Sequence, residues 1–231
     1  KTERAQTDDH PVGTGGSQMK DQPEGVKESP FLKGKNLPPL EERLPEVPKV
    51  ANELPADYLT PEIGIYGGTL RTARLDASND SAVFIIQNEP LVNSPGVLGE
   101  AITPNIVQDY QVSEDQRTFT FTLRKGMKWS DGHPLTMEDV KFAVEDVLFN
   151  EELTPSFPLW LKSGASEDGK PFTFTAVDEY TFQIRFDKPY GGFLIQLAVQ
   201  GWRGYTDLIK PKHYLEKYHI KYTPLEELEP L

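Results

Sequence analysis

Apolar and polar side chains alternate strictly between residues 118 and 123. Phenylalanine and leucine fall on one face and threonine on the other, as Phe119, Phe121 and Leu123 against Thr118, Thr120 and Thr122. Successive side chains of a β-strand point to opposite faces of its sheet. The pattern therefore predicts a strand with one buried face.

A second alternating region is typical of a β-hairpin. Residues 172–177 and 180–186 each alternate, and Asp178-Glu179 stands between them. Two such runs around a short polar turn predict paired antiparallel strands. We expect the two strands to be joined by a two-residue acidic turn and to end before the glycine pair at 191–192.

The hydrophobic period changes to that of a helix after residue 135. Thr136 and Asp139 have the spacing of a capping box, and Leu135 and Val140 can close a hydrophobic staple around it. The apolar residues that follow recur at intervals of three and four: Val140, Ala143, Val144, Val147 and Leu148. We expect a helix from Thr136 to about Leu148 that packs on the core through this face.

Three further segments have weaker patterns. Residues 66–73 predict a first strand that follows two glycines. Residues 102–112 predict a short helix or turn followed by a strand, and residues 193–199 predict a helix.

Residues 1–62 differ in composition from the rest of the chain. A polar, glycine-rich run covers residues 10–17, and prolines recur through residues 37–48 too often for a helix or a sheet interior. We expect residues 1–30 to be disordered and residues 31–62 to lie extended on the surface.

Charge and cysteine content exclude several classes of function. The 231 residues carry a net charge of −12, which argues against binding nucleic acid or anionic lipid headgroups through bulk charge. The sequence has no cysteine, and hence no disulfide, thiolate metal site or cysteine nucleophile. No apolar run reaches the ~20 residues of a membrane span, and no signal peptide is evident, so we expect a mature or trimmed chain.

The residue types of catalytic and metal sites are present, but their spacing does not favour such a site. His213 and His219 are six residues apart, which places them on different faces of a helix. Ser130, Asp131 and His133 share one turn, where contiguous residues cannot face one another as nucleophile, orienter and base. No phosphate-binding or dinucleotide motif is present. We predict no enzymatic activity, no cofactor and no metal.

Aromatic residues give a first candidate for ligand binding. Trp202, Arg203 and Tyr205 lie in a segment flanked by Gly201 and Gly204. Tryptophan and tyrosine can stack on sugar rings or peptide side chains, and an arginine can pair with a carboxylate. The alternative is that these aromatic side chains pack beneath a loop.

The string from Trp129 to Val140, W-S-D-G-H-P-L-T-M-E-D-V, closely resembles family 5 of the extracellular solute-binding proteins of bacterial ABC importers. Tyr66-Gly-Gly-Thr-Leu-Arg71, the proline-rich residues 37–48 and the P-K-H-Y-L string at 211–215 also resemble members of that family. The string at 129–140 identifies the fold, and we do not expect it to contact the ligand.

This resemblance implies a mixed α/β fold of the type II periplasmic-binding-protein class, of which the chain forms an N-terminal part. It implies an arm at residues 1–62, parts of ligand-binding lobe I at residues 63–93 and 196–231, and an inserted α+β subdomain at residues 94–195.

The resemblance also implies a function. Members of the family bind a peptide, an oligosaccharide or another solute between two lobes that close around it, and they present it to an ABC permease. They lie outside the cytoplasm, with the arm following a lipid-modified cysteine in one subgroup. The family places Asn88, Glu89 and Leu91 on the ligand side of the cleft. The alternatives are that Glu89 is a solvated loop acid, that Leu91 is a core residue, and that the chain is an interaction or sensor protein with the same fold.

Overall fold

The computed structural model describes residues 28–49, 65, 67–69, 71, 89–93, 101–199 and 207–228. The strands in these ranges are β1 (Val92–Asn93), β2 (Thr103–Pro104), β3 (Val107–Val112), β4 (Thr118–Leu123), β5 (Thr173–Ala176) and β6 (Thr181–Arg185). The helices are η1 (Pro30–Leu32), α1 (Leu40–Arg43), α3 (Met137–Lys141), η4 (Phe142–Leu148), η5 (Leu159–Leu161), η6 (Ser163–Ala165), α4 (Phe193–Val199), α6 (Lys212–Leu215), η7 (Glu216–Tyr218) and α7 (Leu225–Leu228).

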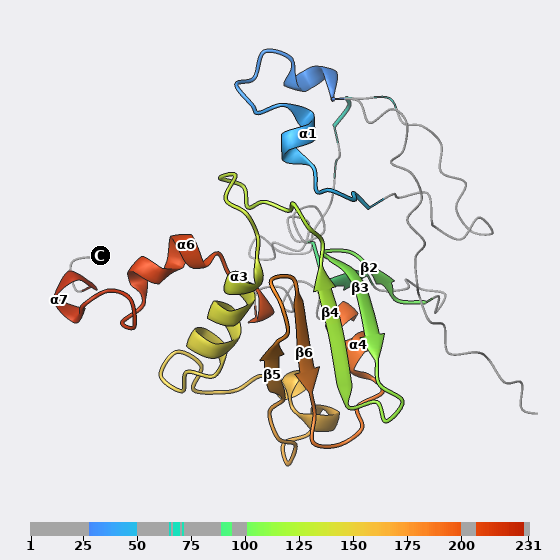
Figure 1. The fold of residues 1–231 in the computed structure, drawn as a ribbon, viewed down its shortest axis with the longest axis vertical. Coiled ribbons are helices and arrows are strands. Elements are labelled where there is room, and N and C mark those ends of the chain that lie inside the picture. The colour runs from blue at the N-terminus through green and yellow to red at the C-terminus, as the bar shows by residue number, and fades with distance from the viewer. Residues whose placement is uncertain are drawn as a thin grey trace, which may run out of the picture.

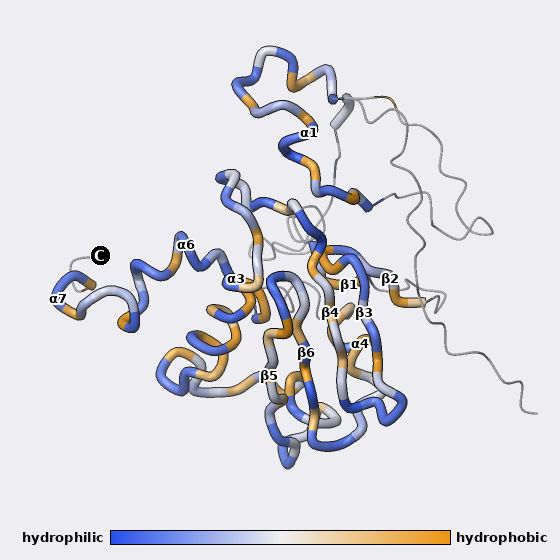
Figure 2. Tube along the Cα trace, viewed as in Figure 1, coloured by the Kyte–Doolittle hydropathy of each residue, from blue (hydrophilic) through white to orange (hydrophobic). Residues whose placement is uncertain are grey.

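A four-stranded antiparallel sheet in the order β3-β4-β6-β5 forms the centre of the fold (Figure 1). The predicted strand at 118–123 is confirmed as β4, and its phenylalanine and leucine face is fully buried. Figure 2 shows the alternation of hydrophobic and hydrophilic positions along the strands. One sheet face is therefore committed to the core, and the other carries threonines and polar residues.

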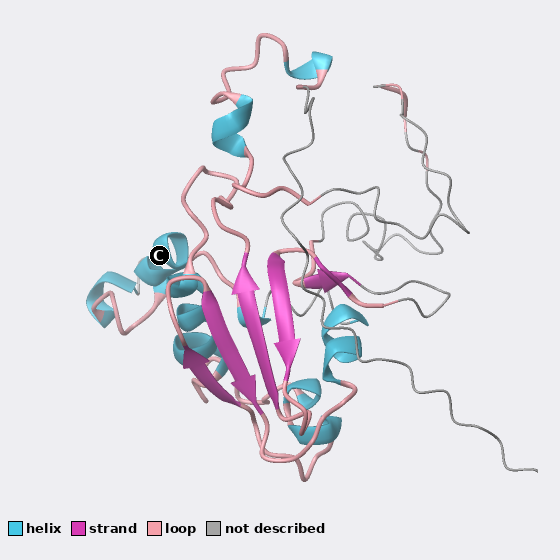
Figure 3. Ribbon diagram, turned by 45° about the vertical axis from the view of Figure 1, so that its right-hand side comes forward, coloured by secondary structure: helices cyan, strands magenta, loops and turns pink. Residues whose placement is uncertain are grey.

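The core lies between this apolar face and helices from both halves of the fold. Phe193 of α4 contacts Phe119 of β4 with ring centroids 4.8 Å apart, and it stacks on Trp160 at 6.1 Å. Side chains of α3 and η4 belong to the same buried cluster, and Figure 3 shows these helices beside the sheet. The helix that we predicted at residues 193–199 is confirmed as α4.

The predicted hairpin is confirmed as β5 and β6, but its connection is longer than the expected two residues. The N–H of Val177 donates to the carbonyl of Thr181 at 2.8 Å, which leaves Asp178, Glu179 and Tyr180 in the turn. The Asp178 carboxylate accepts from the N–H groups of Tyr180 and Thr181, both at 2.8 Å. Tyr180 therefore belongs to the turn because the aspartate satisfies the backbone there.

The capping box of the central helix is confirmed. The N–H of Glu138 donates to Thr136 Oγ1 at 3.3 Å, and the N–H of Thr136 donates to Asp139 Oδ2 at 2.8 Å. The predicted helix continues to Leu148, but η4 is a π-helix, in which the N–H of Phe149 donates to the carbonyl of Val144.

The wider turn of η4 changes which side chains are buried. Four members of the predicted stripe are buried, whereas Val147 is half-buried. Phe142 and Asp146, which lie outside the stripe, are also buried. Phe142 contacts the rings of His219 and Tyr222, so the helix is covered on a second side by the C-terminal segment.

Two other predictions were wrong in part. Residues 102–112 contain no helix: β2 pairs with β1, and β3 begins at Val107. The prolines at 37–48 do not exclude a helix, since α1 forms directly after Pro39 with Glu41 and Glu42 in its first turn. Proline is compatible with a helix N-terminus, where its missing N–H costs nothing.

Most of the other predictions for the N-terminal half lie outside the described residues. These are the disorder of residues 1–27, the extended conformation of residues 50–62 and most of the first strand at 66–73. The domain boundaries at residues 62, 93 and 195 stay predictions.

Candidate functional site

Four of the six predicted ligand-binding residues lie outside the described residues: Asn88, Trp202, Arg203 and Tyr205. The other two, Glu89 and Leu91, lie in a short segment that leads into β1. For all six, ligand binding stays a prediction.

Glu89 is exposed but is held in place by an amide. Asn105 Nδ2 donates to Glu89 Oε2 and to the carbonyl of Pro90, both at 2.8 Å. The backbone N–H groups of Asn105 and Val107 both donate to the carbonyl of Leu91 at 3.2 Å. The Glu89 carboxylate is thus exposed, as in the loop-acid alternative, and Asn105 is its hydrogen-bond partner.

Leu91 lies in the hydrophobic core, with 1% of its surface exposed. Its side chain belongs to the same buried cluster as Phe121 of β4 and Phe193 of α4. This placement corresponds to the core alternative considered for Leu91. Glu89 therefore places a polar group at the surface, whereas Leu91 packs in the core and fixes the segment there.

Arg124, for which the sequence predicts no role, organises the same region. Its side chain is 7% exposed, and it donates from Nε to the carbonyl of Asn105 at 3.1 Å and from Nη1 to the carbonyl of Val47 at 2.6 Å. The N–H of Glu46 donates to the carbonyl of Lys125 at 2.9 Å. Arg124 thus joins the N-terminal arm, the segment before β3 and the end of β4. The signal in the sequence was a charge that directly follows an alternating strand.

The family string at 129–140 holds the C-terminal helix α6 against the turn before α3. Asp131 Oδ2 lies 2.7 Å from His213 Nε2, and the imidazole rings of His133 and His213 stack with centroids 3.8 Å apart. The hydrogen bond with His213, together with one from the N–H of His133, lowers the pKa of Asp131. Both aspartate oxygens are engaged in these structural contacts, as expected for a string that builds the fold.

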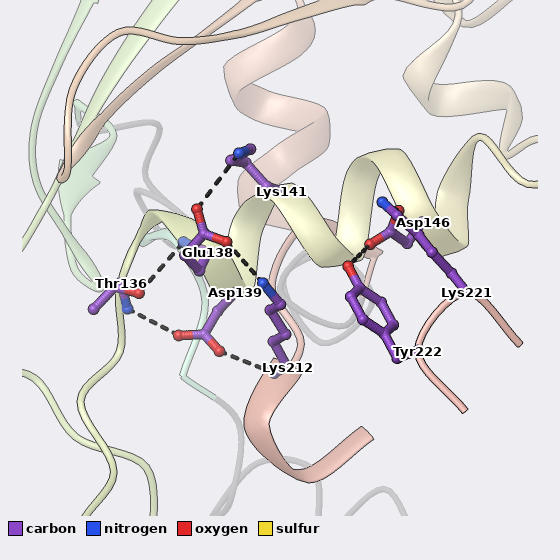
Figure 4. A network of polar contacts seen from close by, with 8 residues as sticks. All are labelled: Thr136, Glu138, Asp139, Lys141, Asp146, Lys212, Lys221 and Tyr222. Carbon is purple, nitrogen blue, oxygen red and sulfur yellow. Dashed lines mark hydrogen bonds and ion pairs between the residues drawn. The ribbon is translucent and has the colours of Figure 1, made fainter. Parts of the chain in front are cut away.

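The first turn of α3 makes a second connection to α6 (Figure 4). Glu138 pairs with Lys212 at 2.8 Å and with Lys141 at 3.4 Å. Asp139 Oδ1 accepts from the backbone N–H of Lys212 at 3.0 Å, while its other oxygen completes the capping box. The hydrogen bond between Lys212 and Glu138 lowers the pKa of Glu138 and raises that of Lys212.

The third connection fixes the second half of the helix to residues 219–222 (Figure 4). Asp146 is 8% exposed and accepts from Lys221 Nζ and from the Tyr222 hydroxyl, both at 2.5 Å. Burial acts to raise the pKa of Asp146, but the hydrogen bonds from Lys221 and Tyr222 outweigh it and the pKa is lowered. His219 Nε2 lies 2.9 Å from the Asp146 carbonyl.

These polar groups do not form a metal site. Within the described ranges, no cluster of three or more histidine, aspartate or glutamate side chains is arranged to hold a metal ion. His213 of α6 pairs with Asp131, whereas His219, which follows η7 and not one continuous helix, pairs with the carbonyl of Asp146. Likewise, none of the helices in the described part of the chain has the length and hydrophobicity of a membrane span.

Comparison with proteins of known sequence identifies a related family. A family model described as bacterial extracellular solute-binding proteins, family 5 Middle, matches residues 101–210. The periplasmic alpha-galactoside-binding protein of Rhizobium meliloti is 30% identical over 220 residues, which cover 87% of this chain and 30% of that protein. A probable ABC transporter-binding protein of Deinococcus radiodurans is 32% identical over 133 residues, which cover 53% of this chain and 21% of that protein.

Solved structures show that the fold is shared as well. An oligopeptide-binding protein OppA matches 94% of this chain with a TM-score of 0.70 and 34% identity, over 31% of its own length. The periplasmic binding protein MelB of Agrobacterium fabrum C58, in complex with stachyose, matches 83% of this chain with a TM-score of 0.59 and 29% identity, over 30% of its own length.

The predicted mixed α/β fold of a periplasmic binding protein is thereby confirmed, and the chain spans about a third of the length of these proteins. The sheet, the capped helix and the hairpin all lie within the region that the family model matches. The chain therefore belongs to family 5 of the bacterial extracellular solute-binding proteins, and its residues 101–210 match the middle region of the proteins in that family.

Proposed function

We propose that this protein is the substrate-binding component of an ABC importer, which binds its solute between two lobes and presents it to a permease outside the cytoplasm. The observation that carries this proposal is the similarity in fold to OppA over nearly the whole chain, at 34% identity. Proteins of this kind bind and release solute without changing it, so we propose a binding protein and not an enzyme.

The solute is a peptide or an oligosaccharide. Two of the most extensive matches are named for sugars, alpha-galactosides in one case and stachyose in the other, and a third is named for oligopeptides. Both solutes need a cleft with aromatic surfaces and a few fixed polar groups. A peptide also needs partners for its charged ends, whereas a neutral sugar needs hydrogen bonds to its hydroxyl groups.

Within this proposal, Glu89 is the described residue that faces the solute. Its carboxylate would accept from a sugar hydroxyl or from a peptide ammonium group, and Asn105 holds it in one position. A polar group that is already ordered loses less conformational entropy on binding. Asn88, Trp202, Arg203 and Tyr205 complete the proposed ligand side.

Titration calorimetry with stachyose and with a mixture of short peptides tests this assignment in the wild-type protein and in Glu89→Gln. The glutamine keeps the shape of the side chain and removes its charge, so we expect affinity for the bound solute to fall about tenfold. Glu114→Gln, on the loop between β3 and β4, is the matched control and leaves the affinity unchanged. Equal affinities for wild type and Glu89→Gln would remove Glu89 from the proposed site.

A further inference from the structure

The strand β5 forms one edge of the four-stranded sheet, and no further strand from the described part of the chain pairs with its outer side. Residues Thr173, Thr175 and Ala176 are exposed. The hydrogen bond from Val177 to Thr181 fixes the ladder, so Thr173 and Thr175 are the residues that exchange hydrogen bonds with β6. The N–H and C=O groups of Phe174 and Ala176 consequently point away from β6, towards the open edge.

Two hollows lie between β5 and the helix formed by α3 and η4, and we call them, together with the outer edge of β5, the groove. Figures 1 and 3 both show the helix alongside β5. One hollow of about 390 Å³ lies between the start of α3, at Glu138 and Lys141, and residues 176–179. A second hollow of about 340 Å³ lies between η4 and residues 172–174. The groove therefore has a hollow at each end of the strand.

The two hollows differ in chemistry. In the second, Phe149 is 41% exposed and packs edge-on against Phe172 with ring centroids 5.4 Å apart, so an apolar surface is open to solvent. In the first, Glu138 is shared between Lys212 at 2.8 Å and Lys141 at 3.4 Å, and the exposed carboxylates of Asp178 and Glu179 give the hollow an excess of negative charge. The hollow at the start of β5 is thus largely apolar, with Glu145 also in its lining, and the hollow at the end of β5 is acidic.

We propose that this groove binds an extended segment of a partner protein, which joins β5 as a fifth, antiparallel strand. Four backbone hydrogen bonds to Phe174 and Ala176 would hold the segment, and the hollows would select its side chains. In this register a basic side chain lies opposite Asp178 and an aromatic or aliphatic one lies opposite Phe172.

The helix beside β5 argues for a peptide segment and against a second copy of the chain. If two β5 strands paired edge to edge, each copy would bring its own α3 and η4 to the same side of the joint. A single extended segment avoids this conflict. The ladder from Phe172 to Asp178 covers seven residues, or roughly 23 Å at ~3.3 Å per residue.

A seven-residue peptide with the sequence Lys-Thr-Val-Thr-Val-Thr-Phe, blocked at both ends and labelled with fluorescein, is the probe. Aligned antiparallel to β5, it places lysine opposite Asp178, the valines opposite Ala176 and Phe174, and phenylalanine opposite Phe172. We expect saturable binding to the 231-residue chain by fluorescence anisotropy. N-methylation of both valines removes the N–H groups that face β5 and should weaken binding about tenfold or more. N-methylation of two threonines, whose N–H groups face outward, is the matched control and should change the affinity little.

Variants of the protein test the same contacts by changing the protein and not the peptide. Ala176→Pro removes an outward N–H of β5 and should weaken binding, whereas Val112→Pro removes an outward N–H at the opposite edge of the sheet and should not. Should Ala176→Pro fail to fold, Glu179→Lys still tests the proposal. This variant should weaken binding of the lysine-containing peptide and strengthen binding of a peptide that carries glutamate instead of lysine.

Two results would overturn the proposal. One is equal binding of the valine-methylated and threonine-methylated peptides, since strand addition requires the inward N–H groups. The other is a dimer of the chain that forms through β5 and displaces the peptide, which would make a second copy the natural occupant. Neither result bears on the proposed solute binding, since β5 and Glu89 belong to different surfaces of the fold.

Discussion

Glu89 and Leu91 show the limits of sequence-based prediction on the proposed ligand side. Glu89 and Leu91 were chosen together because the family places both on the cleft, yet the structure separates an exposed carboxylate from a buried leucine. Glu89 and Leu91 are only two positions apart, and the segment around them is too short for a periodic pattern to predict which side chain faces the core. Arg124 was missed for a related reason, because its partners are backbone carbonyls of residues 47 and 105.

Arg124→Met tests the role of this buried arginine. Methionine keeps the aliphatic part of the side chain but leaves the carbonyls of Val47 and Asn105 without their donor, so we expect a loss of roughly 2–4 kcal/mol in the free energy of unfolding. Denaturant unfolding measures this loss. Arg185→Met, at an exposed position on β6, should change stability by about 0.5 kcal/mol or less.

Asp146→Asn tests the buried carboxylate. The folded pKa of Asp146 lies below its ordinary value, so its charge stabilises the fold above the unfolded pKa of ~3.9, and this contribution is lost as the pH falls through the folded pKa. We expect the variant to be less stable than wild type at pH 7 and the difference to shrink below about pH 4. Unfolding curves at pH 7, 5 and 3 measure it. A difference that does not vary with pH would contradict the assigned charge.

At the scale of elements, strict local patterns predicted strands and helix starts correctly, whereas contacts between distant residues determined the features that the sequence did not predict. The alternation at 118–123 and the capping box at Thr136 both formed as expected, since each is specified by neighbouring residues. The π-helical second half of the central helix was not predictable, because Asp146 and Phe142 are buried by residues 219–222, more than 70 positions away. The position of α1 behind Pro39 was overlooked although proline commonly begins a helix.

Paired substitutions test the orientation of this helix. Val144 is fully buried and Val147 is half-buried, although a regular α-helix would place both on the core face. We expect Val144→Asp to unfold the domain or to reduce its stability by about 3 kcal/mol or more, and Val147→Asp to cost markedly less. Circular dichroism melting curves compare them. Equal losses for the two variants would show that the face is that of a regular α-helix.

At the scale of the whole molecule, the central helix and the turn before it are tied to the C-terminal segment by three polar connections, at Asp131, Glu138 and Asp146. These connections give the string at 129–140 a structural role, because its charged side chains hold α6, while Asp146 holds the residues after it. The described part of the proposed ligand side is the segment Glu89–Asn93, which lies beside β2. The remaining ligand side could be named from the family resemblance but not from any periodic pattern.

The measurement that tests the central claim most directly is a thermal-shift screen of the protein with oligosaccharides and short peptides side by side. A solute that binds the folded state alone stabilises it by mass action, by about 2.7 kcal/mol at one hundred times its dissociation constant. A substrate-binding protein should show a raised melting temperature with one of the two classes of solute. Cooperative melting at an unchanged temperature with both classes would contradict solute transport and favour an interaction or sensor protein with the same fold.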